Sequence, residues 1–123
     1  MSLADFLRDG FPVDLRDQLL RTPLHLAVKA ANLDAVKRLL YQGKASVTRK
    51  DSEGRSPLNI AVQEAAHRTW NPGGPPDSDL QKIYTQIINM LIKNNARVDD
   101  KDNDGKTPWS YAEGDGNQWI RRL

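Results

Sequence analysis

The sequence has 123 residues, 38% of them hydrophobic, which is enough material for one folded domain. Cysteine is absent, and this excludes disulfides, thiolate zinc sites and cysteine nucleophiles. The formal charge is only +2, but residues 1–50 carry nine basic and five acidic side chains. The first part of the chain is therefore mildly basic, and the later part compensates.

No segment has the pattern of a membrane span or of a secretory signal. The longest mostly apolar stretch, residues 83–92, is far shorter than the roughly 20 residues of a transmembrane helix. Residues 1–10 place acidic side chains among apolar ones and lack a basic start followed by an apolar run. We expect an intracellular location, in the cytoplasm or the nucleus.

An internal repeat organises the chain. The segment TPLHLAV at residues 22–28 recurs as SPLNIAV at 56–62 and as TPWSYA at 107–112. Serine or threonine followed by proline is typical of a helix N-terminus, because the hydroxyl caps free amides and proline fits the first helical position. The sequence therefore predicts a helix start at each of the three copies.

A second apolar set follows the first helix at helical spacing, with Leu33, Val36, Leu39 and Leu40 on one face. We expect Gly43 to adopt the left-handed conformation that ends this second helix. Helices this short are marginal in water by themselves, so the pairs are expected to stack on one another.

The TPLH segment at 22–25, the helix end at 39–43 and the turn at 51–54 together resemble the ankyrin repeat. The resemblance implies an all-α solenoid of stacked antiparallel helix pairs joined by β-hairpin loops. It covers nearly the whole chain, which we treat as one domain, 1–123. Its parts are a partial repeat with a hairpin at 1–21, repeats at 22–55 and 56–106, and a partial repeat at 107–123. Both ends fall within a repeat, which fits either a piece of a longer protein or a small protein with abbreviated caps.

The second repeat is interrupted by about 18 extra residues, which we place between its helices at about 65–82. Prolines and glycines make 70–76 a loop, and residues 77–79 are expected to start a long second helix that reaches Asn94. One interpretation is a tolerated insertion, because loop closure costs little extra entropy as a loop lengthens. The other is a binding element in which Trp70 is flanked by His67 and Arg68.

Two smaller departures from the pattern concern turns. Leu20 stands where the equivalent turns have Gly54 and Gly105, so the first hairpin is expected to be either rearranged or strained. Replacement of Leu20 by glycine should then raise the melting temperature. One extra residue within 43–47 should bulge the link after the first repeat.

Residues that could carry catalysis are few. The resemblance implies that His25 is structural, with ring nitrogens bonded to the nearby backbone. Asp17, Asp51 and Asp102 recur with the period, which marks them as hairpin acceptors rather than as an acid/base pair. The sequence contains no phosphate-binding loop, nucleophile motif or metal-ligand spacing. We expect no enzyme activity, no cofactor and no metal.

The resemblance implies a module that binds another protein through its hairpin tips and the exposed side of its first helices. The mildly basic, polar character of these positions suggests an acidic or mixed partner segment. One alternative is a nucleic-acid-binding domain, suggested by a basic row at matching hairpin positions. Another is a regulatory domain of a larger enzyme or transcription regulator. Weak self-association through the repeat ends, where Trp109 and Trp119 lie, is a further possibility. The candidate partner-binding residues are Arg16, Gln18, Leu19, Arg21, Lys29, Lys50, Ser52, Glu53, Arg55, Gln63, His67, Arg68, Trp70, Lys101, Asn103, Asp104 and Lys106.

Overall fold

The computed structural model describes residues 17–69, 78–112 and 120. It contains the α-helices α2 (Pro23–Lys29), α3 (Leu33–Tyr41), α4 (Pro57–Thr69) and α5 (Ser78–Lys93), then the 3-10 helix η1 (Pro108–Ala112). The described residues include no β-strand. The all-α class predicted from the sequence is confirmed.

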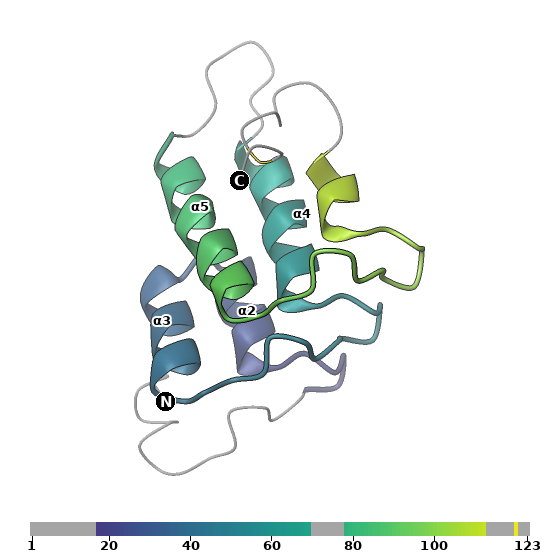
Figure 1. Ribbon diagram of the computed structural model, residues 1–123, viewed down its shortest axis with the longest axis horizontal. Coiled ribbons are helices and arrows are strands. Elements are labelled where there is room, and N and C mark those ends of the chain that lie inside the picture. The colour runs from purple at the N-terminus through teal and green to yellow at the C-terminus, as the bar shows by residue number, and fades with distance from the viewer. Residues whose placement is uncertain (1–16, 70–77, 113–119, 121–123) are drawn as a thin grey trace.

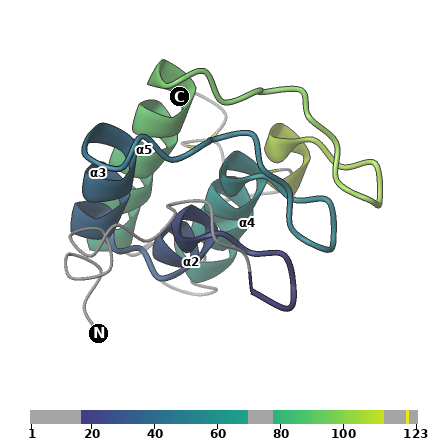
Figure 2. The same cartoon turned by 90° about the horizontal axis from the view of Figure 1, so that it is seen from below.

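The helices form two layers. One layer holds α2, α4 and η1, with α4 packed between the other two, and the second layer holds α3 and α5 (Figure 1). The loops that lead into α2, α4 and η1 project from the first layer on the side away from α3 and α5 (Figure 2). This is the stacked arrangement of a solenoid, in which each unit packs on its neighbours.

The predicted helix starts are present. Thr22 caps α2, and its hydroxyl and the side chain of His25 exchange hydrogen bonds with each other's backbone amides, which is a capping box. The second copy starts α4 at Pro57, and the third starts η1 at Pro108. Within the described residues the third copy is thus a 3-10 helix rather than an α-helix.

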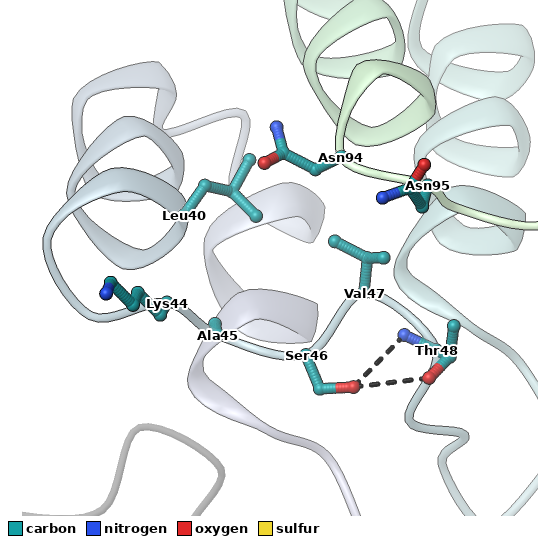
Figure 3. Close-up of a pocket in the computed structure, with 8 residues that line it drawn as sticks. All are labelled: Leu40, Lys44, Ala45, Ser46, Val47, Thr48, Asn94 and Asn95. Carbon is teal, nitrogen blue, oxygen red and sulfur yellow. Dashed lines mark hydrogen bonds between the residues drawn. The ribbon is translucent and has the colours of Figure 1, made fainter.

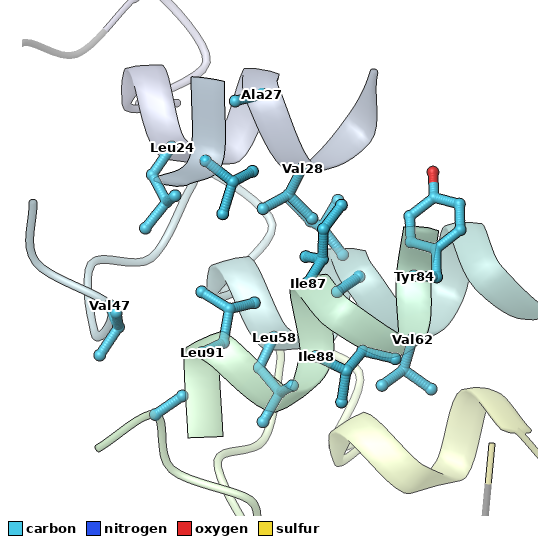
Figure 4. Packing of buried hydrophobic residues seen from close by; sticks show 14 of the residues in the cluster. Leu24, Ala27, Val28, Val47, Leu58, Val62, Tyr84, Ile87, Ile88 and Leu91 are labelled. Carbon is cyan, nitrogen blue, oxygen red and sulfur yellow. The ribbon is translucent and has the colours of Figure 1, made fainter. Parts of the chain in front are cut away.

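One hydrophobic core runs through both layers (Figure 4). Leu24 and Leu58, at the same position of two repeats, are fully buried, and α5 contributes the fully buried Tyr84, Ile87, Ile88 and Leu91 from the second layer. Trp109, at the equivalent third position, is only partly buried but packs against the same core. A short amphipathic helix gains its stability from packing, so this core stabilises the helices. The loops that lead into α2, α4 and η1 are anchored by these helices.

The second unit is built from longer helices than the first. α4 has 13 residues where α2 has 7, and α5 has 16 where α3 has 9. The added turns lie at the ends of α4 and α5 that face away from the hairpins (Figure 1). The loop expected at 70–76 lies outside the described residues.

The expectation for Gly43 is wrong, because the left-handed residue after α3 is Lys44, with φ 51°. In α5 the reversal comes at Asn95, and the next amide, of Ala96, donates to Leu91. After α3 the amide of Gly43 still donates to Arg38, so the chain reverses one residue later. The extra residue predicted in this link is thus accommodated at the end of the helix, and it moves the left-handed conformation off the glycine.

Candidate functional site

The loops that lead into α2, α4 and η1 form three hairpins, at residues 17–21, 51–55 and 102–106. Each hairpin is closed by an aspartate at its first position. Asp17, Asp51 and Asp102 each accept two main-chain hydrogen bonds of 2.9 Å on Oδ1, from the amides two and four residues later. Their own amides donate to the carbonyls of Arg21, Arg55 and Lys106 at 2.9 to 3.0 Å. The predicted role of these aspartates as hairpin acceptors is confirmed.

The hairpins lie side by side (Figure 2), and hydrogen bonds join them to one another. The amide of Ser52 donates to the carbonyl of Leu19 at 2.8 Å, and the amide of Asn103 donates to the carbonyl of Glu53 at 2.9 Å. The side-chain amide of Asn103 adds a bond of 3.0 Å to the carbonyl of Ser52. Adjacent hairpin tips are therefore linked through their backbones.

The second and third hairpins are each tied to the first helix of the preceding unit by the residue three places after the serine or threonine that starts that helix. His25 Nδ1 accepts from the amide of Thr22 at 3.1 Å, and its Nε2 lies 2.9 Å from the carbonyl of Arg55 in the next hairpin. A carbonyl only accepts, so the proton is on Nε2. Asn59 repeats this with the carbonyl of Lys106 at 3.3 Å. The structural role expected for His25 is confirmed.

Most candidate residues of the hairpins are solvent-exposed. This set comprises Gln18, Leu19, Lys50, Ser52, Glu53, Lys101, Asn103, Asp104 and Lys106. Arg21, Arg55 and Gln63 are partly buried. Arg55 donates to Gln63 at 3.0 Å, so the hairpin and the exposed side of α4 lie within side-chain reach. These hairpin residues, together with Lys29 of α2 and Gln63 of α4, form one surface, which we call the strip.

The arginines of the strip are neutralised within their own hairpins. Arg21 Nε lies 2.8 Å from Asp17, and Arg55 Nε lies 3.1 Å from Asp51 and 3.4 Å from Glu53. Hydrogen bonds to Asp17, first from the amide of Arg21 and then from its guanidinium, outweigh desolvation and lower the pKa of that carboxyl. These arginines therefore stabilise their own hairpins, and their charges are partly compensated there.

In the third hairpin a tyrosine, rather than an arginine, bonds Oδ2 of the closing aspartate. The hydroxyl of Tyr111 donates to Asp102 Oδ2, and the ammonium of Lys106 lies 5.7 Å from the centre of the Tyr111 ring. Desolvation would raise the pKa of Asp102, but the bonds from Tyr111 and from the amides of Lys106 and Asp104 lower it overall. Burial and the bond to Asp102 raise the pKa of Tyr111 well above its ordinary value. Tyr111 therefore stays a neutral donor.

Three candidates lie in the last turns of the first helices, Lys29 on α2 and His67 and Arg68 on α4. Arg68 donates to the carbonyl of Lys29 at 3.1 Å and to the hydroxyl of Tyr84 at 3.0 Å. Burial raises the pKa of Tyr84, against the effect of the Arg68 guanidinium. Arg68 thereby joins the lengthened second unit to the end of α2, while His67 beside it is exposed. Two other candidates, Arg16 and Trp70, lie outside the described residues.

Exposed apolar side chains add positions that sequence reasoning did not select. Leu26 on α2 is 42% exposed, although Ile60 at the same position of the second unit is 2% exposed. Tyr41 and Val98 are also exposed. The pattern alone could not separate Leu26 from Ile60, because both are aliphatic and stand at the same repeat position.

An open pocket of about 400 Å³ lies where the extra residue after α3 widens the link (Figure 3). It is lined by Leu40, Lys44, Ala45, Ser46, Val47, Thr48, Asn94 and Asn95. The amine of Lys44 points away from the two asparagines, so the lining offers amides, hydroxyls and aliphatic carbons rather than converging charge (Figure 3). The described part of the chain contains no cluster of metal-ligating side chains and no helix suited to cross a membrane.

Comparisons with known proteins agree with the repeat architecture. The family model described as "Ankyrin repeats (many copies)" matches residues 7–61. The chain is 32% identical over 112 residues to a Transient receptor potential cation channel subfamily A member 1 homolog of Caenorhabditis elegans, covering 86% of this chain. It is also 32% identical over 112 residues to Neurogenic locus notch homolog protein 1 of Homo sapiens, covering 89% of this chain. The match spans only 9% and 4% of those two proteins.

Proposed function

Because this chain is made of ankyrin repeats, we propose that it binds another protein through the strip formed by its hairpins and the exposed side of its first helices. Ankyrin repeats are in general protein-interaction modules without catalytic activity of their own. The match to a small part of much longer relatives adds the proposal that the module serves a larger protein. An intracellular location remains a prediction.

One observation supports the strip more than any other. The backbone of the hairpins is internally bonded in register, through Ser52 to Leu19 and Asn103 to Glu53, while the side chains at those positions are exposed. A surface that is already ordered loses little conformational entropy when it binds. Less of the free energy of the contacts is therefore offset by ordering of the strip.

The nucleic-acid alternative has less support. Of the predicted basic row, Arg21 and Arg55 are paired with carboxylates of their own hairpins. Glu53 and Asp104 stand exposed among the lysines. Phosphate-driven binding weakens steeply with added salt, so titration of a random duplex at two salt concentrations tests the alternative directly. Tight, salt-sensitive binding of the duplex would favour it over a protein partner.

Affinity capture with matched variants tests the proposed function. A strip variant carries Ser52→Arg, Glu53→Lys and Asp104→Lys, and an outer-face control carries Lys37→Glu and Gln86→Lys on the exposed sides of α3 and α5. A third variant replaces residues 70–77 by a short linker. We expect a partner captured by the wild type to be lost with the strip variant and kept with the outer-face control.

Other results would overturn the proposal. Retention of the partner by the strip variant together with its loss from the linker variant would assign binding to the insertion and not to the strip. Loss with the outer-face control alone would assign it to the second layer of helices. All variants must show the same helical circular dichroism spectrum as the wild type.

A further inference from the structure

The first hairpin and α2 expose three leucines at positions where the later repeats differ. Leu19 is 52% exposed, Leu20 43% and Leu26 42%. In the second unit these positions hold Glu53, Gly54 and the buried Ile60, and in the third they hold Asp104, Gly105 and Tyr111. We call Leu19, Leu20 and Leu26 the leucine corner.

The later units show that hairpin and helix share one face at these positions. Tyr111, which stands where Leu26 stands, bonds Asp102 at the base of its hairpin. Arg55 reaches Gln63, the position that Lys29 holds in the first unit. By the same repeat geometry Leu26 faces the hairpin that carries Leu19 and Leu20. The three side chains thus belong to one corner between hairpin and helix.

Leu20 is held in a strained conformation. Its φ is 59°, in the left-handed region, and the first hairpin keeps the same main-chain bonds as the glycine-containing ones. The conformation costs free energy for a leucine, and a side chain that stays 43% exposed recovers only part of it by burial. Strained backbone conformations of this kind cluster at functional sites.

The first unit, which carries the leucine corner, holds more basic than acidic side chains. Residues 17–50 contain seven basic and two acidic side chains, and both carboxylates are paired, Asp17 with Arg21 and Asp34 with Arg38. By contrast, residues 51–69 and 78–112 contain seven basic and eight acidic side chains. Lys29, three residues after Leu26 and hence on the same side of α2, is exposed and forms no ion pair within the described residues.

We propose that the leucine corner binds an acidic polypeptide segment that carries bulky aliphatic or aromatic side chains. The apolar side chains of the segment pack on Leu19, Leu20 and Leu26, and its carboxylates face Lys29 on the same side of α2. This inference rests on the proposed function and adds the place and the chemistry of the contact.

Two other anionic ligands fit less well. Single-stranded nucleic acid binds on stacked aromatic side chains, and the leucine corner contains none. A membrane surface takes a helix with one continuous apolar face, whereas α2 has seven residues, four of them buried in the core. Both ligands are nevertheless included as arms of the test.

The binding test uses three labelled peptides of equal length and measures fluorescence anisotropy with the full chain. One peptide combines glutamate with leucine and phenylalanine, the second replaces its apolar residues by serine, and the third replaces glutamate by lysine. We expect the first to bind at least about tenfold more tightly than the other two, since each loses one of the two complementary features. Equal affinity for all three would overturn the proposal.

Two glycine substitutions separate binding from stability. Leu20→Gly relieves strain and removes part of the leucine corner, so it should raise the melting temperature and weaken binding of the acidic apolar peptide about fivefold. Ala31→Gly is the matched control, because Ala31 is also left-handed, with φ 57°, but lies at the turn after α2. It should raise the melting temperature and leave peptide affinity unchanged.

A third substitution removes an apolar side chain from α2. Leu26→Ser should weaken binding of the acidic apolar peptide about tenfold.

The remaining arms use a random DNA duplex, single-stranded DNA and phosphatidylserine-containing vesicles. Binding of any of them that exceeds peptide binding and falls with Leu20→Gly would reassign the leucine corner to that ligand. Leu20→Gly with unchanged peptide affinity would show that Leu20 is no part of the contact. If peptide binding fails while a captured partner still depends on the strip, the chemistry proposed here is wrong and the proposed function stands.

Discussion

The first and second units of the stack share their bonds and differ in their surfaces. Both hairpins are closed by an aspartate. In both first helices the residue three places after the N-cap, His25 or Asn59, bonds the next hairpin. Yet the first unit exposes leucines and cations, while the second buries Ile60, holds both charge signs and extends its helices. The difference teaches that a few repeated polar contacts specify the scaffold and leave the outer positions free to diverge.

The largest effect should come from breaking the bond that joins the units. His25→Ala leaves the buried amide of Thr22 and the carbonyl of Arg55 without their partner, which should cost about 3 kcal/mol in the free energy of unfolding. His25→Asn places the residue of the second unit at this position and should cost only about 1 kcal/mol. Urea unfolding followed by circular dichroism measures both. Equal losses would show that the imidazole packs rather than bonds.

The next effect tests why the second hairpin needs glycine where the first has leucine. A Cβ on Gly54, with φ 77°, would lie 2.8 Å from the amide nitrogen of Asn103, whereas a Cβ on Gly105 would meet nothing within 4 Å. Gly54→Ala should therefore cost about 2 kcal/mol, from strain plus crowding, and Gly105→Ala about 1 kcal/mol from strain alone. Thermal unfolding of the two variants gives the comparison, and the reverse order would contradict it.

Relief of strain in the first hairpin should have a smaller, stabilising effect. Leu20→Gly removes a left-handed leucine that costs about 1 to 2 kcal/mol but adds freedom to the unfolded chain, so the net gain should be about 0.5 to 1 kcal/mol. The melting temperature should rise by a few degrees. A fall would show that Leu20 packs more favourably than its exposure indicates.

The smallest effect concerns pH. The pKa of Asp102 is lower in the folded state than its ordinary value of 3.8, so the unfolded state takes up protons first as the pH falls. The stability due to this carboxylate is present at neutral pH and is lost as the pH falls from near 4 through the folded pKa. Asp102→Asn should therefore be less stable than the wild type at pH 7, and the gap should narrow at pH 3. A constant gap would contradict the assignment.

The sequence predicted the elements that local chemistry determines. Ser/Thr-Pro starts, the hairpin aspartates and the start of α5 at Ser78 were readable because each depends on residues a few places apart. The alignment of Leu20 with two glycines predicted a first hairpin that is either rearranged or strained, and the positive φ of Leu20 shows that it is the second. Helix pairs and their stacking followed from the period.

The parts that depend on neighbours in space could not be read in this way. Lys44 rather than Gly43 reverses the chain, because the helix end absorbs an extra residue that the glycine signal does not reveal. The contact of Arg68 with Lys29 and Tyr84 joins residues 39 and 16 places apart. The exposure of Leu26 depends on what covers it, which its own residue type does not determine.

The most direct test of the central claim is site-specific photo-crosslinking to the captured partner. A photoreactive amino acid is placed in turn at Gln18 and Gln63 on the strip, and at Lys37 and Gln86 on the second layer of helices. We predict crosslinks to the partner from the two strip positions and none from the other two. Crosslinks from Lys37 or Gln86, with none from Gln18 or Gln63, would contradict the account.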